Sequence, residues 1–433
     1  MTDYHALNPV ELQAEKEALQ KEYDAHVAKG LKLNMARGKP SSEQLDLSML
    51  LLSEIVASDE VIAEDGTDAR NYGVLDGLPE AKALMAHFVD DDADHVIVLG
   101  TSSLTGMYDT VARCWAFGTG GHKPWSQLET VKWLCPSPGY DRHFAITEAF
   151  GFEMIPIAMT EDGPDMDVVE ELVANDPAIK GIWCVPKYSN PGGVTYSDDV
   201  VDRLAAMPCA AEDFRIFWDN AYGVHHLYDE AEQQDQVKDI RKACEVAGNP
   251  DRAFKFASTS KVTFPGSGVA VFASSDNNIA EAKHAMSVQM IGHDKINQLR
   301  HVAFLKDADG IAEHMSKHAA ILRPKFELVD RVLEEELTDV AECSWSKPRG
   351  GYFVSFNAPA HTAKRIVSLA KEAGVTLTGA GATYPYGNDP LDSNIRIAPS
   401  LPPEEELAQA LDVFTTCVKL AYAEKLLEEG AEA

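Results

Sequence analysis

The sequence is short of positive charge. Its 433 residues contain 38 lysines and arginines against 69 aspartates and glutamates, which gives a formal net charge of −31. A surface with this excess of acid repels the phosphate backbone of DNA or RNA, so we expect no nucleic-acid partner. The same excess is typical of a soluble protein that stays dispersed, and we expect a cytoplasmic location.

Long apolar runs and paired cysteines are also absent. No stretch reaches the roughly 18–20 apolar residues that a membrane-spanning helix needs, so we expect no membrane partner. The opening residues, MTDYHALNPVELQAEKEALQKEYD, lack the apolar core of a secretory signal. The seven cysteines include no C-x-x-C pair and lie at positions 114, 135, 184, 209, 244, 343 and 417. We therefore expect reduced thiols, without a disulfide framework or a metal site.

The hydrophobic residues, 45% of the chain, suffice for a large core. Between residues 70 and 300, short apolar segments alternate with helical patterns, which predicts a three-layer αβα domain. The apolar segments are rich in Val, Ile, Phe and Trp, as is typical of buried strands in a mostly parallel sheet. These predicted strands cover residues 95–99, 181–185, 214–218, 253–257 and 269–273.

The two chain ends differ from the middle. Asn8 and Pro9 predict the start of a first helix, and Gly30 predicts its end. The last third combines predicted strands at residues 350–356 and 394–400 with a helix near 361–373 and a terminal helix after Pro402–Pro403. This mixture predicts a smaller α+β domain.

We expect the smaller domain to contain both ends of the chain. The expected division is an N-terminal helix and arm over residues 1–48, a large α/β domain over 49–310, and a C-terminal α+β part over 311–433.

Four short segments follow one another at the carboxyl ends of predicted strands or within them. They are YSNPGG (188–193), DNAY (219–222), STSK (258–261) and NIRIAPS (394–400). Ligands of open α/β sheets bind outside the carboxyl ends of the strands. Each segment alone has an ordinary explanation: a surface lysine, a turn or helix cap, or one half of an ion pair. Their joint occurrence is much less expected by chance.

These segments resemble the pyridoxal-phosphate (PLP) aminotransferases of fold type I, over nearly the whole chain. The segments MARGKPS, NYGVLDG, CPSPGYDRH and STSKVTFPGSG are similar to the aspartate aminotransferase subgroup Ic. The resemblance implies a PLP cofactor, a three-layer αβα large domain with a mostly parallel sheet, and a smaller α+β domain from both chain ends.

The resemblance also implies catalytic roles for Lys261, Asp219 and Tyr222. Lys261 would form the Schiff base with PLP and then move a proton between Cα and the cofactor. Asp219 would keep the pyridine nitrogen protonated, which the electron sink requires. Asn190 and Tyr222 match the groups that donate to the cofactor's phenolate oxygen. Tyr140 matches the aromatic residue stacked on the ring, with an ordinary core tyrosine as the alternative.

The phosphate end departs from the family pattern. Thr101, Ser102 and Ser103 precede a predicted helix whose N-terminus suits an anion, although simple helix capping explains them too. Ser258 matches a phosphate-binding serine of the family. The family's arginine eight residues after the lysine is replaced by Val269, and the run PGSG fills residues 265–268.

The resemblance also assigns three residues to the substrate. Arg396 matches the arginine that binds the α-carboxylate, and planar bidentate pairing makes arginine suited to this task. Asn190 and Gly38 match substrate-binding positions, Gly38 in a loop that closes over the substrate. For a distal carboxylate the sequence offers Arg37, with a surface arginine as the alternative explanation. Less suited cations are Lys39, Lys123 and Arg142.

Tyr72 in NYGVLDGLPE resembles a tyrosine that reaches the phosphate of the neighbouring subunit, with a plain turn as the alternative. We therefore expect a homodimer with shared active sites. The N-terminal helix shows an apolar side without an obvious partner in its own chain, and we expect it to add to the dimer contact.

The expected function is aspartate:2-oxoglutarate transamination by a ping-pong mechanism through a lysine aldimine. Fold does not fix reaction type, so alanine or aromatic transamination, C–S lysis, β-elimination and decarboxylation stay open. A PLP-sensing regulatory module is disfavoured because MARGKP begins at residue 35, too early for a DNA-binding domain ahead of it. A PLP-free binding protein is the remaining alternative.

Overall fold

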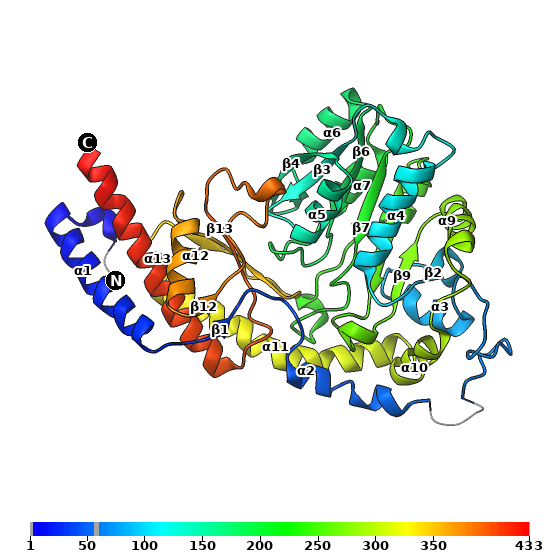
Figure 1. Cartoon of the computed structure of the whole chain (residues 1–433), viewed down its shortest axis with the longest axis horizontal. Helices are drawn as coiled ribbons and strands as arrows, with labels where there is room; N and C mark the ends of the chain where they lie inside the picture. Colours follow the sequence, from blue (N-terminus) through cyan, green and yellow to red (C-terminus); the bar gives the residue numbers. More distant parts are fainter. Residues whose placement is uncertain (1–2, 56–59, 433) are drawn as a thin grey trace.

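An eight-stranded, mostly parallel sheet is the centre of the larger part of the molecule (Figure 1). The computed structural model describes residues 3–55 and 60–432. The strand order is β2-β9-β8-β7-β6-β3-β4-β5. Neighbours from β8 to β4 run parallel, whereas β9 is antiparallel to β8 and β2, and β5 is antiparallel to β4. The strands are β2 (Val96–Val98), β3 (Lys132–Ser137), β4 (Glu153–Thr160), β5 (Gly163–Pro164), β6 (Ile179–Cys184), β7 (Arg215–Asp219), β8 (Ala253–Ser258) and β9 (Ala270–Ala273).

Helices cover both faces of this sheet. Successive side chains of a strand point to opposite faces, and in β7 Phe217 packs on one face while Ile216 and Trp218 pack on the other. The Phe217 face is covered by α4 (Ser103–Phe117), α5 (Asp141–Ala149) and α9 (Asp276–Gln289). The opposite face is covered by α3 (Pro79–Ala86), α6 (Met166–Asn175), α7 (Asp198–Ala206), α8 (Ile240–Val246) and α10 (Lys295–Leu305). The predicted three-layer αβα architecture is confirmed.

The smaller part combines both ends of the chain. β1 (Leu33–Asn34) pairs in parallel with β12 (Val375–Thr376), so the N-terminal arm is tied to the C-terminal region. An antiparallel sheet of order β10-β11-β13 packs beside them. The other elements are β10 (Ser344–Trp345), β11 (Val354–Asn357), β13 (Asn394–Ile397), α12 (Ala363–Glu372) and α13 (Glu404–Glu432). The predicted α+β architecture is confirmed.

The first helix has its partner in its own chain. Helix α1 (Pro9–Ala28) lies along α13, and Figure 1 shows the blue and red helices side by side. Leu12, Leu19 and Tyr23 of α1 are buried in the same core as α13. The prediction that α1 lacks an intrachain partner is therefore wrong. Its partner lies almost 400 residues later in the sequence, where local patterns give no sign of it.

One long helix joins the two parts. In α11 (Ala308–Leu337), Ile311 and Met315 pack with the large sheet, whereas Leu322 and Phe326 belong to the core of the smaller part. The short α2 (Ser42–Asp46) lies against α11 (Figure 1). The described residues include no helix with the length and apolar character needed to cross a membrane.

The two strands predicted in the smaller part are shorter than expected. The strand predicted at 350–356 begins only at Val354, because Gly351 adopts a left-handed φ of +82° that interrupts extended backbone. The strand predicted at 394–400 ends at Ile397, after which Ala398 donates its backbone N–H to Met35 instead of to the sheet.

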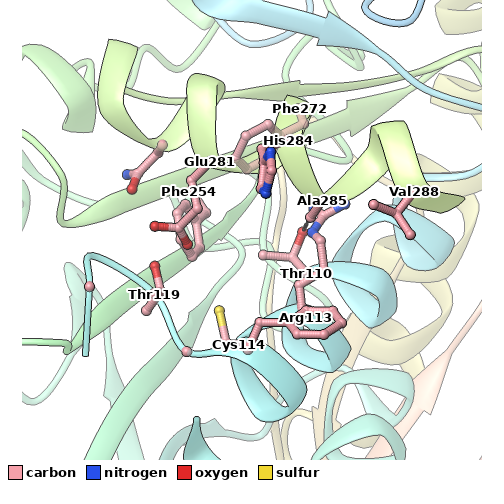
Figure 2. A pocket seen from close by; sticks show the side chains of 15 residues that line it. Thr110, Arg113, Cys114, Thr119, Phe254, Phe272, Glu281, His284, Ala285 and Val288 are labelled. Carbon is pink, nitrogen blue, oxygen red and sulfur yellow. Dashed lines mark hydrogen bonds between the residues drawn. The ribbon is translucent and has the colours of Figure 1, made fainter. Parts of the chain in front are cut away.

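A cavity of about 400 Å³ lies between α4 and α9, over Phe254 and Phe272 of the sheet (Figure 2). Figure 2 shows Thr110 and Arg113 of α4 facing Ala285 of α9 across it. Its lining shares no residue with the sheet-edge cavity described next, so it is not part of the candidate site.

Candidate active site

A cavity of about 130 Å³ lies at the carboxyl ends of β6, β7 and β8. Parallel strands bring the segments that follow them to the same sheet edge, which explains why residues far apart in the sequence meet here. The lining residues are Ser102, Ser103, Leu104, Met107, Tyr140, Val185, Asn190, Asp219, Ala221, Tyr222, Ser258, Ser260 and Lys261. Most of the site residues predicted from the sequence are therefore brought together.

Asp219 is the last residue of β7 and is buried. Its Oδ2 lies 3.0 Å from Nε2 of His143. Its Oδ1 is also buried and has no hydrogen-bond partner among the residues that the structure describes. An unpartnered buried carboxylate oxygen is costly, so this atom favours a ligand that brings a donor or a positive charge.

His143 is a site residue that the sequence reasoning missed. Its ring stacks on Trp183 at 4.5 Å between centroids and contacts the Asp219 carboxylate, although His143 does not itself line the cavity. Tyr140 packs edge-on against His143, with centroids 4.9 Å apart. His143 follows Tyr140 by three residues at the start of α5, so helical spacing was the signal that could have found it.

Lys261 lies three residues beyond the end of β8, with Nζ 4.7 Å from the centroid of the Tyr222 ring. Burial lowers the pKa of the Lys261 ammonium, and the negative charge of Asp219 opposes this shift. A lowered pKa makes the neutral amine, the form that can attack a carbonyl or accept a proton, easier to reach.

Two tyrosines border the same space. Tyr222 is buried and stacks on Tyr352, and burial raises the pKa of its phenol well above the ordinary value. Burial, assisted by Asp219, raises the pKa of Tyr140 to about 12. Both hydroxyl groups therefore stay protonated near neutral pH and can donate hydrogen bonds.

Arg396 lies on β13 of the smaller part and does not line the cavity itself, but it contacts Asn190, which does. Its Nη1 donates to Oδ1 of Asn190 at 3.2 Å and to Oδ1 of Asp141 at 2.9 Å. Its Nε is buried and has no hydrogen-bond partner within the described parts of the chain. Asp141 thus uses one nitrogen of the guanidinium, whereas the Nε hydrogen of Arg396 is still available to a ligand beside Asn190.

Gly38 and Arg396 both lie against the Phe353 side chain. A Cβ atom at position 38 would be 2.2 Å from Cζ of Phe353, so only glycine fits this close approach. The Phe353 ring in turn lies 4.8 Å from the centre of the Arg396 guanidinium. The predicted substrate loop and the predicted carboxylate arginine are therefore neighbours.

The opposite end of the cavity is built for an anion without an arginine. Ser102 caps α4 by accepting the backbone N–H of Leu104 at 3.2 Å. Ser258 and Ser260 face each other with hydroxyl oxygens 2.9 Å apart, and Ser260 also bonds the carbonyl of Thr101. Ser260 was not predicted as a site residue, although it lies two residues after Ser258 in STSK, and residues two apart in an extended segment point to the same side.

Val269, which takes the place of the family's phosphate-binding arginine, cannot bind an anion. Val269 is buried in the hydrophobic core, and no arginine is among the described residues that line the cavity. Hydroxyl groups and the N-terminal amides of α4 are the anion donors that remain.

Several predicted residues lie outside the cavity. Tyr72 is 82% exposed, in a loop beside Lys295. Arg37, Lys39, Lys123 and Arg142 are exposed as well. Lys123 follows the far end of the 15-residue α4, a helix about 22 Å long whose start borders the cavity.

Comparison with known proteins agrees with this geometry. Residues 7–430 match the family model described as aspartate amino-transferase. A putative aminotransferase of Mycolicibacterium smegmatis is 50% identical over 427 residues, covering 98% of this chain and 99% of the relative. The aspartate aminotransferase of Corynebacterium glutamicum is 48% identical over 433 residues, with the same coverage.

Solved structures show the same relationship. The crystal structure of an aspartate transaminase from Corynebacterium glutamicum superposes with a TM-score of 0.94 at 46% identity, over 98% of this chain and 99% of that one. The α-aminoadipate aminotransferase of Thermus thermophilus, complexed with N-(5'-phosphopyridoxyl)-L-leucine, has the same fold, with a TM-score of 0.72 at 20% identity over 94% of this chain and 95% of that one. The chain therefore belongs to the aspartate aminotransferase family, has the PLP fold type I architecture and is an aminotransferase.

Proposed function

We propose that the protein transfers the amino group of aspartate to 2-oxoglutarate, with PLP as cofactor on Lys261 and a ping-pong mechanism. One observation carries the proposal. Lys261 shares a cavity with a buried oxygen of Asp219 that lacks a hydrogen-bond partner among the described residues.

The residues present fit PLP. Asp219 Oδ1 supplies the acceptor that a protonated pyridine nitrogen needs, and Tyr140 offers an aromatic face nearby. Asn190 and Tyr222 would meet the phenolate oxygen. When bound, PLP supplies an electron sink that stabilises negative charge at the Cα of an amino acid.

The phosphate of the cofactor would lie at the start of α4. The amides of this helix, together with Thr101, Ser102, Ser103 and Ser258, would replace the arginine that the family pattern puts at position 269. The helix dipole favours an anion here, although a full cation is missing.

The chain's own groups explain the proton movement. The lowered pKa of Lys261 leaves its amine able to accept a proton from Cα once substrate has released the side chain. Arg396 and Asn190 would bind the α-carboxylate, and Gly38 would let the substrate loop approach closely.

Aspartate needs a second cation for its distal carboxylate. Apart from Lys261, no lysine or arginine lines the cavity among the described residues, and the predicted Arg37 is exposed. The second cation would come from Arg37 after loop closure, or from a neighbouring subunit. Its absence from the cavity also favours a second candidate function, transamination of a monocarboxylate amino acid such as alanine or an aromatic one.

We propose in addition that the protein is a cytoplasmic homodimer with shared sites, Tyr72 of one subunit reaching the phosphate of the other. The proposed domains are residues 1–48, 49–310 and 311–433. Helix α11 crosses the last of these boundaries, because Ile311 and Met315 pack with the large sheet and the rest of the helix ends in the core of the smaller part.

A panel of amino donors with 2-oxoglutarate tests the proposal, with the oxo-acid products identified. Aspartate is expected to give oxaloacetate faster than alanine or an aromatic donor gives its own oxo acid. Reduction with borohydride and peptide mapping are expected to place the pyridoxyl group on Lys261. A label on another lysine, or preference for a monocarboxylate donor, would contradict the site or the substrate respectively.

A further inference from the structure

The peptide segment that carries Lys261 is held by buried groups from outside its own strand. Tyr352 donates its hydroxyl hydrogen to the carbonyl oxygen of Lys261 at 3.4 Å. The next carbonyl, that of Val262, accepts from Oγ of the buried Ser48 at 3.4 Å and lies 2.8 Å from Nε2 of His314. Tyr352 and His314 are both buried. Two consecutive carbonyls of the lysine segment are therefore anchored.

Gln44 is the centre of this network. It lies on α2 and is fully buried. Its Oε1 accepts the backbone N–H of Ser41 at 3.1 Å, which fixes the orientation of the amide. Both Nε2 hydrogens are then directed inward, one to the Tyr352 hydroxyl oxygen at 2.8 Å and one to Nδ1 of His318 at 3.0 Å. Because Tyr352 receives from Gln44, its own hydrogen is free for Lys261.

The same network lies next to the substrate loop. Gly38 precedes α2, and its nearest side chain is Phe353, the neighbour of Tyr352. Phe353 contacts Gly38 and Arg396, whereas Tyr352 contacts the Lys261 carbonyl. One dipeptide thus touches both the substrate-carboxylate side and the lysine side of the site.

We propose that Gln44 and Tyr352 are positioning residues, which hold the Lys261 backbone in register with the substrate loop. This inference rests on the proposed function, in which Nζ of Lys261 moves a proton to and from Cα. Misplacing a reacting group by about 1 Å costs up to about 10²-fold in rate. Loss of one anchor that leaves the strand intact is therefore expected to cost about 10-fold in kcat.

Tyr352→Phe, Gln44→Leu and the double variant test the role, with Gln298→Leu as matched control. Gln298 is also a buried glutamine, but it accepts the backbone N–H of Leu78, and no hydrogen bond among the described residues joins it to the network. The measurements are kcat and KM for the amino donor, and the visible circular dichroism of the resting holoenzyme, which reports how the cofactor is held on the lysine.

Each positioning variant is expected to lose about 10-fold in kcat with KM changed less than about twofold, and to weaken the visible circular dichroism. The double variant is expected to match the single variants, because all three break one chain of hydrogen bonds. Gln298→Leu is expected to leave kcat and the dichroism unchanged.

Tyr352→Phe removes a single oxygen atom and so keeps the test open if Gln44→Leu folds poorly. Variants with lower melting temperature but wild-type kcat and dichroism would overturn the positioning role while leaving the proposed function standing. A wild-type protein that binds no PLP and shows no visible band would overturn the proposed function and the positioning role together.

Discussion

At the scale of single residues, the balance of charge around Asp219 decides what the cavity can hold. One carboxylate oxygen is used by His143, and the other has no hydrogen-bond partner within the described chain. A pyridinium nitrogen would use this oxygen, so the carboxylate is expected to act on the electronics of the cofactor more than on its affinity.

Asp219→Ala is therefore expected to lose about 10²–10³-fold in kcat while still forming a visible cofactor band, as for a removed electrostatic stabiliser. Absorbance titration with PLP and steady-state kinetics separate the two effects, and far-ultraviolet circular dichroism checks folding. Near-normal turnover would refute the role of Asp219.

Asp141 is expected to compete with substrate for Arg396. Its Oδ1 takes a hydrogen bond from the same Nη1 that contacts Asn190, and the Asp141 side chain is 33% exposed. A partly exposed ion pair of this kind is worth up to about 1 kcal/mol, or about fivefold in an equilibrium. Asp141→Asn is therefore expected to lower KM by up to about fivefold with kcat little changed.

Donors with one and with two carboxylates should respond to Asp141→Asn by the same factor, because each carries the α-carboxylate. A raised KM for all donors would instead mean that Asp141 holds Arg396 in its binding position.

At the scale of elements, the sequence predicted those strands whose position depends mainly on their own run of apolar residues. The predicted strands at 214–218 and 253–257 differ by one residue from β7 and β8, whose Val-, Ile-, Phe- and Trp-rich runs are buried on both faces. Because β7 and β8 are parallel, the residues that end or follow them lie at the same edge of the sheet, and the sequence could therefore predict that Asp219 and Lys261 are close.

Other elements lacked a local signal. Strands β3 and β4 were not predicted; each contains a proline, Pro136 and Pro156, which lowers strand propensity. The Gln44 network joins α2, α11 and the segment before β11, so no window of sequence contains it. Contacts between segments so far apart in the sequence depend on how the large and small parts of the molecule pack together.

The start of α1 is an element whose stability can be tested directly. Asn8 accepts from the backbone N–H groups of Val10 and Glu11, and Glu11 accepts from the Asn8 N–H. Removing this capping box by Asn8→Ala is expected to cost about 1 kcal/mol of the free energy of unfolding, measured by urea denaturation. Asn8→Ser should keep most of the stability. Equal stability of all three proteins would show that the α1–α13 contact alone fixes the helix.

At the scale of the whole molecule, one exposed loop is the basis of the proposed dimer. Nζ of the buried Lys295 donates to the carbonyls of Asn71 and Gly73, so the backbone around Tyr72 is held in place. The Tyr72 side chain itself is 82% exposed. A large aromatic group presented by a fixed loop is typical of a contact surface.

The 3-10 helix η2 (Met49–Ser53), which packs against the same α10 that carries Lys295, adds exposed apolar side chains. They are Met49, Leu50 and Leu52. These side chains and the Tyr72 loop are the candidate contacts of the proposed two-fold dimer.

Mixing two inactive variants tests whether the sites are shared. In Tyr72→Ala the lysine is intact, and in Lys261→Ala the tyrosine is intact. If Tyr72 serves the neighbouring site, a mixed dimer regains one complete site, formed by Lys261 of the first variant and Tyr72 of the second. Random exchange makes about half of the dimers mixed, so an equimolar mixture should recover up to about a quarter of wild-type activity. Subunit exchange is verified with differently tagged chains. No gain over the separate variants, with exchange complete, would mean that each site is built from a single chain.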